Sequence, residues 1–356
     1  MTPTLAFFNN QGGVDKTSLC YHMAWMFAEL GARVLVVDLD PQANLTSMFL
    51  DDEQLEAIWP DADHHPQTIQ GVVAPLLEGT GDIEPAPLRE VGENIHLVPG
   101  DMALSVFEDE LSLAWPRCLD PQAASFRTTT AFLRMVLQAA RECKATVALV
   151  DVGPNLGAIN RAALLVCHGV AFPLAADLFS LQGLRNLGPT LRHWRQEWNE
   201  RVERMPTSIQ QEFQQLLEAH EPAVVKAQLQ DKMQPLGYLI LQHAVLRDRP
   251  VKAYARWAGR IPALYREKVL ATSADSAPEF AQDPHCLGLL KHYRSLMPLA
   301  MEARKPIFHL RPADGAIGAH MQAVKDCYGE FRQLACSLAG KMALSLPLLA
   351  QLSPRR

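Results

Sequence analysis

The sequence predicts an α/β protein with a mostly parallel, twisted sheet and helices on both faces. Short apolar runs recur along the 356-residue chain, separated by segments with helical spacing of apolar residues. Several of these runs end directly in a turn that carries glycine or aspartate. This alternation is typical of open parallel sheets, whose strands are buried on both faces. We expect strands at about residues 4–9, 33–38, 95–98, 146–151, 169–174 and 236–242, with a helical periphery.

The first apolar run leads into residues 9–18, which read NNQGGVDKTS. A strand that enters a glycine-containing turn and then a helix surrounds an anion with backbone N–H groups and the helix N-terminus. Gly12 and Gly13 let the backbone close on that anion. Lys16 supplies a positive charge for the outer phosphates, and Thr17 supplies a hydroxyl suited to Mg²⁺. The segment is therefore interpreted as a phosphate-binding loop.

The strict pattern G-x-x-x-x-G-K-[ST] is not met, because Asn10 and Asp15 replace its two glycines. The segment instead resembles the deviant Walker A loop of the ParA/MinD family of P-loop ATPases, normally K-G-G-V-G-K-T-[TS]. In this chain Gln11 stands at the signature lysine, and Asp15 stands at the glycine before the P-loop lysine. The resemblance implies ATP and Mg²⁺ as cofactors. It implies nucleotide contacts from Gly12, Gly13, Val14, Asp15, Lys16, Thr17 and Ser18.

The second apolar run, residues 33–38, delivers carboxylates to the carboxyl edge of the sheet, where open parallel sheets bind ligands. Its continuation, D-x-D-P-Q, resembles the switch I segment of the family. The resemblance implies that Asp40 orients the attacking water. Lys16 and Gln11, the latter at the signature-lysine position, complete the implied catalytic set.

The run at residues 146–151 continues as DVGPNLG and is similar to the family's switch II. The resemblance implies that Asp151 approaches Mg²⁺ through water, with Thr17 as the other metal residue. Taken alone, Asp40 or Asp151 fits a structural turn carboxylate as well as a functional one. Their order after the loop favours the nucleotide site.

Further segments match the family in order, so the resemblance covers nearly the whole chain. Residues 95–101 resemble the strand and turn before its middle helices, and residues 171–187 resemble the strand and helix of its dimer surface. Residues 302–315 resemble its C-terminal block. By this resemblance Pro312 and Asp314 contact the adenine.

The two loop substitutions weaken the expected activity for different reasons. A neutral Gln11 cannot offset the negative charge that develops in phosphoryl transfer, and losing such a group commonly costs roughly 100-fold in rate. Asp15 brings a carboxylate towards the phosphates. Two like charges about 4 Å apart repel by roughly 4 kcal/mol at an effective dielectric of about 20, unless the side chain points outward.

Composition favours an intracellular protein with one large core. The chain is 48% hydrophobic, and its seven cysteines form no C-x-x-C pair. We expect all seven to be buried small apolar residues. No apolar run reaches the roughly 20 residues that span a bilayer, so we expect a cytoplasmic protein without membrane contact. An iron–sulfur reductase of the same fold is set aside, because residues 151–160 contain no cysteine.

One ParA-like domain is expected over residues 1–340, with insertions at 51–90 and 190–234 and a tail at 341–356. The second insertion reads as a helical arm, which either holds a partner or enlarges the fold. Leucines of the tail are expected to pack on the body. A proline at position 347 and the lack of a lysine-rich face argue against an interfacial membrane anchor.

A basic segment at residues 246–268 is the candidate DNA contact despite the net charge of −6. Four-residue spacing places three of its cations on one helical face. A solvated helix face is the alternative, while the family resemblance favours DNA binding without sequence preference and a nucleoid location. The candidate DNA-binding residues are Arg247, Arg249, Lys252, Arg256 and Arg260.

Two functions follow as hypotheses. The first is a ParA-like ATP-dependent homodimerising switch that partitions or positions DNA or another cargo, with an adaptor protein stimulating a hydrolysis impaired by Gln11 and Asp15. The alternative is a catalytically inactive pseudo-ATPase that acts as a scaffold or regulator through protein contacts.

Overall fold

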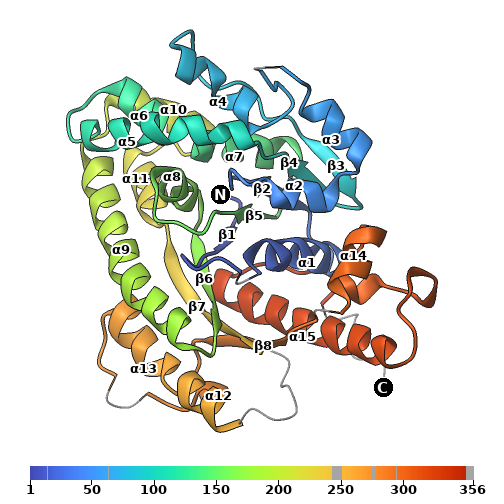
Figure 1. Ribbon diagram of the computed structural model, residues 1–356. Helices are drawn as coiled ribbons and strands as arrows, with labels where there is room; N and C mark the ends of the chain where they lie inside the picture. Colours follow the sequence, from blue (N-terminus) through green and yellow to red (C-terminus); the bar gives the residue numbers. More distant parts are fainter. Residues whose placement is uncertain (14, 63, 243–250, 275–276, 294, 350–356) are drawn as a thin grey trace.

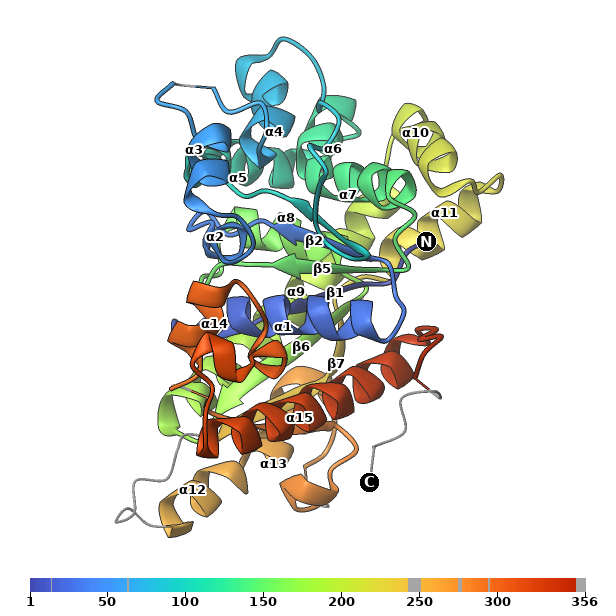
Figure 2. The ribbon, with the colours of Figure 1, turned by 90° about the vertical axis from the view of Figure 1, so that its right-hand side faces the viewer.

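An eight-stranded sheet separates two layers of helices in the computed structural model (Figures 1 and 2). The structure describes residues 1–13, 15–62, 64–242, 251–274, 277–293 and 295–349. The strand order is β3-β4-β2-β5-β1-β6-β7-β8, and β3 alone runs antiparallel to its neighbour. The strands are β1 (Thr4–Phe7), β2 (Val34–Asp38), β3 (Arg89–Gly92), β4 (Ile95–Val98), β5 (Val147–Asp151), β6 (Gly169–Ala175), β7 (Gln234–Gln242) and β8 (Cys286–Lys291).

The central strands are buried on both faces, which explains their continuous apolar sequences. Every residue of β1, β2, β5 and β6 is buried. Because successive side chains point to opposite faces, Val34 and Val36 enter one hydrophobic cluster while Leu35 and Val37 enter the other. The sheet therefore has a hydrophobic core on each side.

The first helical layer packs around α1 and the long C-terminal helix, which lie side by side in Figures 1 and 2. It contains α1 (Lys16–Glu29), α2 (Asn44–Phe49), α3 (Asp52–Ile58), α14 (Met297–Ala303) and α15 (Ala319–Met342). Short turns of helix complete it. These are η4 (Ile307–His309) and η5 (Pro312–Asp314).

The second layer covers the other face, with α9 along one side of the molecule and α12 at the bottom of the view (Figure 1). It contains α4 (Ile69–Glu78), α5 (Phe107–Arg117), α6 (Ala123–Thr129), α7 (Ala131–Glu142), α8 (Ala158–Val166), α9 (Leu178–Glu203), α10 (Thr207–Leu217), α11 (Pro222–Gln230), α12 (Val251–Ala258) and α13 (Ile261–Tyr265). Three short segments accompany them. These are η1 (Met102–Val106), η2 (Arg266–Leu270) and η3 (Phe280–Gln282).

The six predicted strands are confirmed, but the prediction missed the two edge strands β3 and β8. The sequence of β3, REVG, is polar, and in β8 three of the six residues are half-buried and one is exposed. An edge strand packs fewer apolar side chains than a central one, so its pattern resembles that of a loop.

The stretch 51–90 forms α3, α4 and the start of β3, while α9 already begins upstream of the predicted arm.

Three of the four C-terminal leucines expected to pack on the body do so, whereas Leu348 is 37% exposed. Leu346 is buried, and Leu344 and Leu349 contact the same core cluster. The helix before them ends at Met342, two residues beyond the predicted end of the domain at residue 340. In the part of the chain that the structure describes, no helix is long and apolar enough to cross a membrane.

Four of the seven cysteines are buried as expected, whereas Cys143, Cys286 and Cys336 are half-buried. All seven are free thiols. The half-buried thiols correct the expectation that every cysteine acts as a buried apolar residue.

A buried lysine lies at the amino end of β7. Lys232 is 1% exposed, and its Nζ lies 3.3 Å from His168 Nε2 and 3.0 Å from Met1 Sδ. Burial lowers the pKa of Lys232 to about 7, and burial also lowers the pKa of His168 to about 3. Thr4 N donates a hydrogen bond to His168 Nδ1, so the proton of the neutral ring lies on Nε2. A neutral lysine amine can accept a hydrogen bond from this Nε2–H group.

Replacement of this lysine by methionine is expected to change the pH dependence of stability. Between pH 7 and 10.5 the unfolded chain binds more protons at Lys232 than the folded chain, so the free energy of unfolding rises with pH in that window. Lys232→Met should flatten this rise and should stabilise the protein at pH 7 by up to a few kcal/mol. Urea unfolding at several pH values measures both effects. The exposed Lys325→Met is the control, and an equal pH slope in both variants would contradict the argument.

Candidate nucleotide site

The phosphate-binding loop leaves the sheet at its centre, because β1 pairs with β5 on one side and with β6 on the other. α1 begins at Lys16, directly after the loop. A Cβ added to Gly12 or Gly13 would meet no atom within 4 Å, and Gly13 has a φ of 75°, a conformation that favours glycine. The loop therefore keeps open space where a phosphate group would approach the backbone.

The loop and both switch segments line one open pocket of about 860 Å³. It contains most of the residues predicted from the loop and switch I, namely Gly12, Gly13, Asp15, Lys16, Thr17, Ser18 and Asp40. Sequence reasoning missed seven others. These are Gln42, Asn44, Ser47, Met48, Pro154, Met297 and Met301. Val14 lies outside the described residues.

The two predicted metal residues lie in direct contact. Thr17 Oγ1 donates a hydrogen bond of 2.8 Å to Asp151 Oδ2. Among the described residues no group of three or more His, Cys, Asp or Glu forms a ready-made metal site. Mg²⁺ typically takes few protein ligands together with substrate phosphates and water. A hydroxyl beside one buried carboxylate fits that ligand set.

The titratable groups at the pocket are buried, and the pKa of each depends on the charges of its neighbours. Burial raises the pKa of Asp151 well above its ordinary value, Asp38 raises it further, and the hydrogen bond from Thr17 and the charge of Lys16 lower it. Burial also lowers the pKa of Lys16, while Asp151 and Asp40 raise it. Lys16 Nζ donates to Gln11 O at 3.3 Å, which holds the amine across the loop.

A buried network holds the start of switch I. Asp38 Oδ2 accepts hydrogen bonds from Thr46 N at 2.8 Å and from Thr46 Oγ1 at 2.7 Å. The same hydroxyl accepts from Gly100 N at 2.7 Å, so one threonine joins β2 to the turn after β4. Burial raises the pKa of Asp38 to about 7, the Thr46 hydrogen bonds lower it, and Asp40 raises it. The sequence did not indicate Thr46 or Gly100 as site residues.

Switch I and switch II approach each other at Asp40. Its Oδ1 accepts from Gln42 N at 3.0 Å, and a Cβ added to Gly153 would lie 3.2 Å from the same oxygen. Asn160 on α8 holds Gly153 from the other side, since its Oδ1 accepts from Gly153 N at 2.9 Å and its Nδ2 donates to Gly153 O at 3.0 Å. Asn160 is buried, and sequence reasoning missed it.

The residue at the signature-lysine position binds its own chain. Gln11 Oε1 accepts a hydrogen bond of 3.1 Å from Ser180 Oγ in the first turn of α9. Ser180 Oγ in turn accepts from Ala175 N at 3.0 Å. Gln11 N donates to Asn9 Oδ1 at 3.0 Å. Gln11 therefore joins the loop to the end of β6 and the start of α9.

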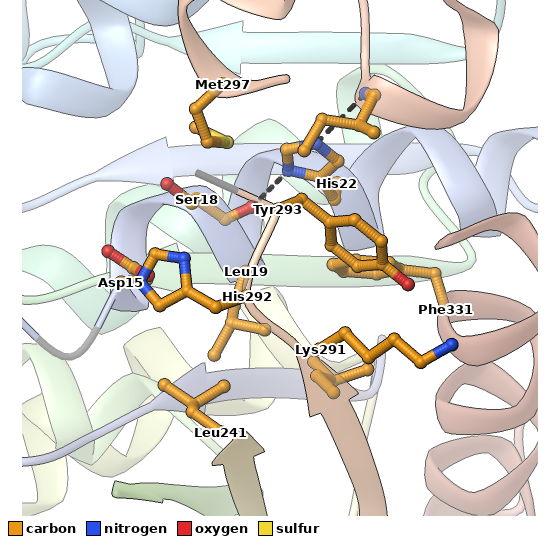
Figure 3. A pocket seen from close by; sticks show the side chains of 12 residues that line it. Asp15, Ser18, Leu19, His22, Leu241, Lys291, His292, Tyr293, Met297 and Phe331 are labelled. Carbon is orange, nitrogen blue, oxygen red and sulfur yellow. Dashed lines mark hydrogen bonds and ion pairs between the residues drawn. The ribbon is translucent and has the colours of Figure 1, made fainter. Parts of the chain in front are cut away.

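The carboxylate of Asp15 lies between the loop and a neighbouring pocket (Figure 3). Asp15 has a φ of 38° and a ψ of 32°, and its Oδ2 lies 3.5 Å from His292 Nε2. Left-handed backbone is unfavourable for most L-residues, although aspartate tolerates it better than most, which explains why glycine suits this position. The side chain is 47% exposed. Asp15 contacts His292 but also lines the phosphate pocket, so its carboxylate stays close to the phosphate site.

The neighbouring pocket has a mainly apolar lining. Its apolar side chains are Leu19, Leu241, Leu290, Tyr293, Met297, Ile307 and Phe331. Pro312 and Asp314 are not among the described residues that line it, and Asp314 forms an ion pair of 2.9 Å with Lys305. The adenine contact assigned to these two residues stays a prediction.

A neutral histidine of α1, His22, lines this pocket and binds η4 (Figure 3). His22 Nε2 accepts from Ile307 N at 3.1 Å, so the proton lies on Nδ1, which donates to Ser18 O at 2.7 Å. Burial lowers the pKa of His22 to about 4. The contact holds η4 against the helix that follows the phosphate-binding loop.

The candidate DNA-binding residues are only partly described. Arg247 and Arg249 lie outside the described residues, and Lys252 lies on α12. Arg256 and Arg260 are exposed, and their guanidinium groups lie 5.1 and 5.0 Å from the Trp257 ring centre.

The expected single basic helical face is wrong, because α12 ends at Ala258 and Arg260 lies in the turn before α13. In the wider segment, Arg266 pairs with the buried Asp283 at 2.7 Å and has a structural role.

The fold and this loop define a P-loop ATPase of the ParA/MinD type. The AAA_31 family of AAA domains matches residues 2–204, and the chain belongs to it. The chain is 29% identical to the Caulobacter vibrioides chromosome partitioning protein ParA over 201 residues, 56% of this chain and 66% of that protein. It is 30% identical to Escherichia coli IncC over 194 residues, 54% of this chain and 47% of IncC. The matched stretch thus leaves a third or more of each relative uncovered.

Solved structures share the fold over nearly the whole chain. Protein DIP2308 from Corynebacterium diphtheriae has a TM-score of 0.67 and 26% identity, covering 96% of this chain and 99% of that one. An McdA variant from Cyanothece in complex with ATP has a TM-score of 0.58 and 15% identity, covering 95% and 96%. At the lower identity the likeness concerns the fold alone.

The hydroxyl of Thr46 is expected to be essential for the switch I network. Thr46→Val keeps the shape but leaves the Asp38 carboxylate and the Gly100 N–H without this partner, so the free energy of unfolding should fall by roughly 2 to 3 kcal/mol. Thr46→Ser keeps the hydroxyl and should cost about 1 kcal/mol or less. Urea denaturation compares the variants. Equal losses in both would show that packing of the methyl group, and not the hydroxyl, matters.

Proposed function

We propose that this chain binds ATP with Mg²⁺, forms a nucleotide-dependent homodimer, binds DNA without sequence preference and hydrolyses ATP slowly. The observation that carries the proposal is the pocket that joins Lys16 and Thr17 of the loop to Asp40 of switch I, with Thr17 in contact with Asp151 of switch II. In the proposed complex, Lys16 and the N-terminus of α1 bind the phosphates. Bound Mg²⁺ would neutralise phosphate charge, with Thr17 as its direct ligand and Asp151 acting through water.

The mainly apolar pocket beside the loop suits the base of the nucleotide. Ser18 and Met297 line both this pocket and the phosphate pocket, so a single extended ligand can occupy the two. Leu19 and Phe331 offer apolar contact, and binding sites for small molecules combine such surface with a few polar groups. Asp40 is proposed to orient the water that attacks the outer phosphate.

An exposed apolar rim supports dimerisation over the nucleotide. Met102 and Val106 follow β4, Leu156 follows β5, and Leu178 and Phe179 follow β6, so all five lie at the carboxyl edge of the sheet around the loop. Phe179 is 73% exposed. Large exposed apolar side chains gathered at one edge are typical of interaction sites. We propose that a second copy of the chain covers this rim when nucleotide is bound.

DNA binding is proposed for the region of α12 and the following turn. Arg256 and Arg260 are exposed, and both of their guanidinium groups lie close to the Trp257 ring. Guanidinium groups bind phosphate well, and contacts of this kind carry no sequence information. A dimer would present two such surfaces. This role would place the protein at the nucleoid, where it would partition or position a cargo and would respond to an adaptor protein.

Slow hydrolysis is proposed because both loop substitutions act against it. Gln11 is neutral and forms its hydrogen bond with Ser180, whereas catalysis of phosphoryl transfer benefits from added positive charge. The same hydrogen bond favours the alternative, a pseudo-ATPase that uses the fold as a scaffold for protein contacts. Nucleotide-stimulated dimerisation separates the two functions, because only the switch requires it.

Restoring glycine in the loop is expected to strengthen ATP binding. Asp15→Gly removes a carboxylate near the phosphates and relieves left-handed backbone strain, and we expect the Kd for Mg-ATP to fall roughly tenfold. Calorimetry measures binding, and light scattering after size exclusion measures dimerisation. Glu218→Gly, another position with positive φ, is the control, and Lys16→Ala should abolish binding. If neither the parent nor Asp15→Gly binds ATP, the scaffold function is the correct one.

The two described arginines near α12 are expected to contribute to DNA affinity. Replacing Arg256 and Arg260 together with alanine should weaken binding of a random-sequence duplex. It should also lower the slope of log K against log salt by about 2, because each arginine releases about one counterion. Fluorescence anisotropy at several salt concentrations in the presence of Mg-ATP measures the slope. Arg117→Ala with Arg204→Ala removes two exposed arginines elsewhere, and an equal effect there would assign the binding to net charge alone.

A further inference from the structure

A carboxylate from α5 caps the N-terminus of α8, the helix that follows switch II. Glu108 Oε1 accepts a hydrogen bond of 2.6 Å from Ala158 N, and Oε2 accepts one of 2.8 Å from Ile159 N. The N-cap of α8 is Gly157, which has no side chain to serve these groups. The first N–H groups of a helix have no partner within the helix, and a negative charge there is favourable. Glu108 therefore supplies the missing cap from another helix.

Gly157, the residue before α8, leaves room for the Glu108 carboxylate to approach the first turn of this helix. A Cβ added to Gly157 would lie 2.7 Å from Glu108 Oε1 and 2.9 Å from Asn155 Oδ1, which is closer than real Cβ contacts. Gly157 N also donates to Asn155 Oδ1 at 2.8 Å. The end of switch II and the capping carboxylate are thus packed directly against each other.

The first turn of α8 is connected to the nucleotide pocket by one side chain. Asn160 follows the two capped residues and donates through Nδ2 to Asn155 O at 2.8 Å. It also binds both backbone groups of Gly153, the residue beside Asp40. A shift of the α8 N-terminus would therefore move Asn160, and with it the switch II backbone that borders the carboxylate of Asp40.

In the chain, Glu108 directly follows η1, whose exposed side chains belong to the apolar rim at the carboxyl edge of the sheet. η1 ends at Val106, and α5 begins at Phe107, which is buried in the core. Met102 and Val106 in η1 are 61% and 64% exposed. Because η1 leads directly into α5, displacement of this exposed surface would also displace the Glu108 carboxylate from α8.

We infer that Glu108 is a positioning residue for ATP hydrolysis, acting through the α8 N-terminus and Asn160 on switch II, and that it connects the η1 surface to the nucleotide pocket. The inference rests on the proposed ATPase function. Both of these hydrogen bonds of Glu108 go to backbone N–H groups of α8, outside the phosphate-binding loop, so its effect should appear in the rate of reaction more than in nucleotide affinity.

Two variants and one control test the inference on the full chain. In Glu108→Ala, single-turnover hydrolysis of Mg-ATP should slow by roughly 10- to 100-fold, since small displacements of catalytic groups have effects of that size. The Kd for Mg-ATP should change less than about threefold, because the loop is untouched. Glu108→Gln keeps one acceptor oxygen and should recover part of the rate. Glu110→Ala, an exposed carboxylate on the same helix, should behave as the parent.

Amide hydrogen exchange without nucleotide provides a readout that does not need ATP. Exchange over residues 152–160 should speed up in Glu108→Ala, less so in Glu108→Gln, and not in Glu110→Ala. Unchanged exchange in Glu108→Ala would overturn the inference, as would faster exchange with an unchanged hydrolysis rate. If Glu108→Ala fails to fold, Glu108→Gln carries the same comparison. Failure of the proposed function itself appears in the parent chain, as absence of ATP binding or hydrolysis, whereas failure of this inference appears only in the variants.

Discussion

The position of β1 between β5 and β6 is the constraint on which the site depends. Parallel pairing on both sides places the end of β1 beside the ends of its neighbours. Since β2 pairs with β5 in register, Asp38 lies directly opposite Asp151. The phosphate-binding loop, switch I and switch II therefore meet at one edge although about 110 residues separate the two switches in sequence. Strand pairing, and not local sequence, assembles the pocket.

This assembly brings several charges together away from water. Asp38 and Asp151 are fully buried, and Lys16 is nearly so. Each buried carboxylate is held by a threonine hydroxyl, Thr46 for Asp38 and Thr17 for Asp151. Burial of a charge is costly unless it is paired or hydrogen-bonded. The two hydroxyl groups therefore stabilise the buried carboxylates as well as belonging to the site.

The unusual loop residues each make a contact outside the loop. Gln11 bonds to Ser180, and Asp15 contacts His292 at the mouth of the mainly apolar pocket. Both contacts join the loop to the β6–α9 and β8–α14 connections of the same chain. The loop of this protein is thus connected to its own scaffold at both substituted positions. That arrangement fits both a slow switch and a scaffold, and nucleotide-stimulated dimerisation distinguishes the two.

The sequence by itself determined the α/β class, the six inner strands and seven of the residues that line the phosphate pocket, because buried parallel strands have continuous apolar runs and the loop has a local pattern. Tertiary structure alone decided the rest. The edge strands β3 and β8, the direction of the Gln11 and Asp15 side chains, and the supporting residues Thr46, Asn160 and Glu108 depend on neighbours distant in the chain. A local pattern carries no information about such neighbours, since hydrogen-bond partners are selected by packing.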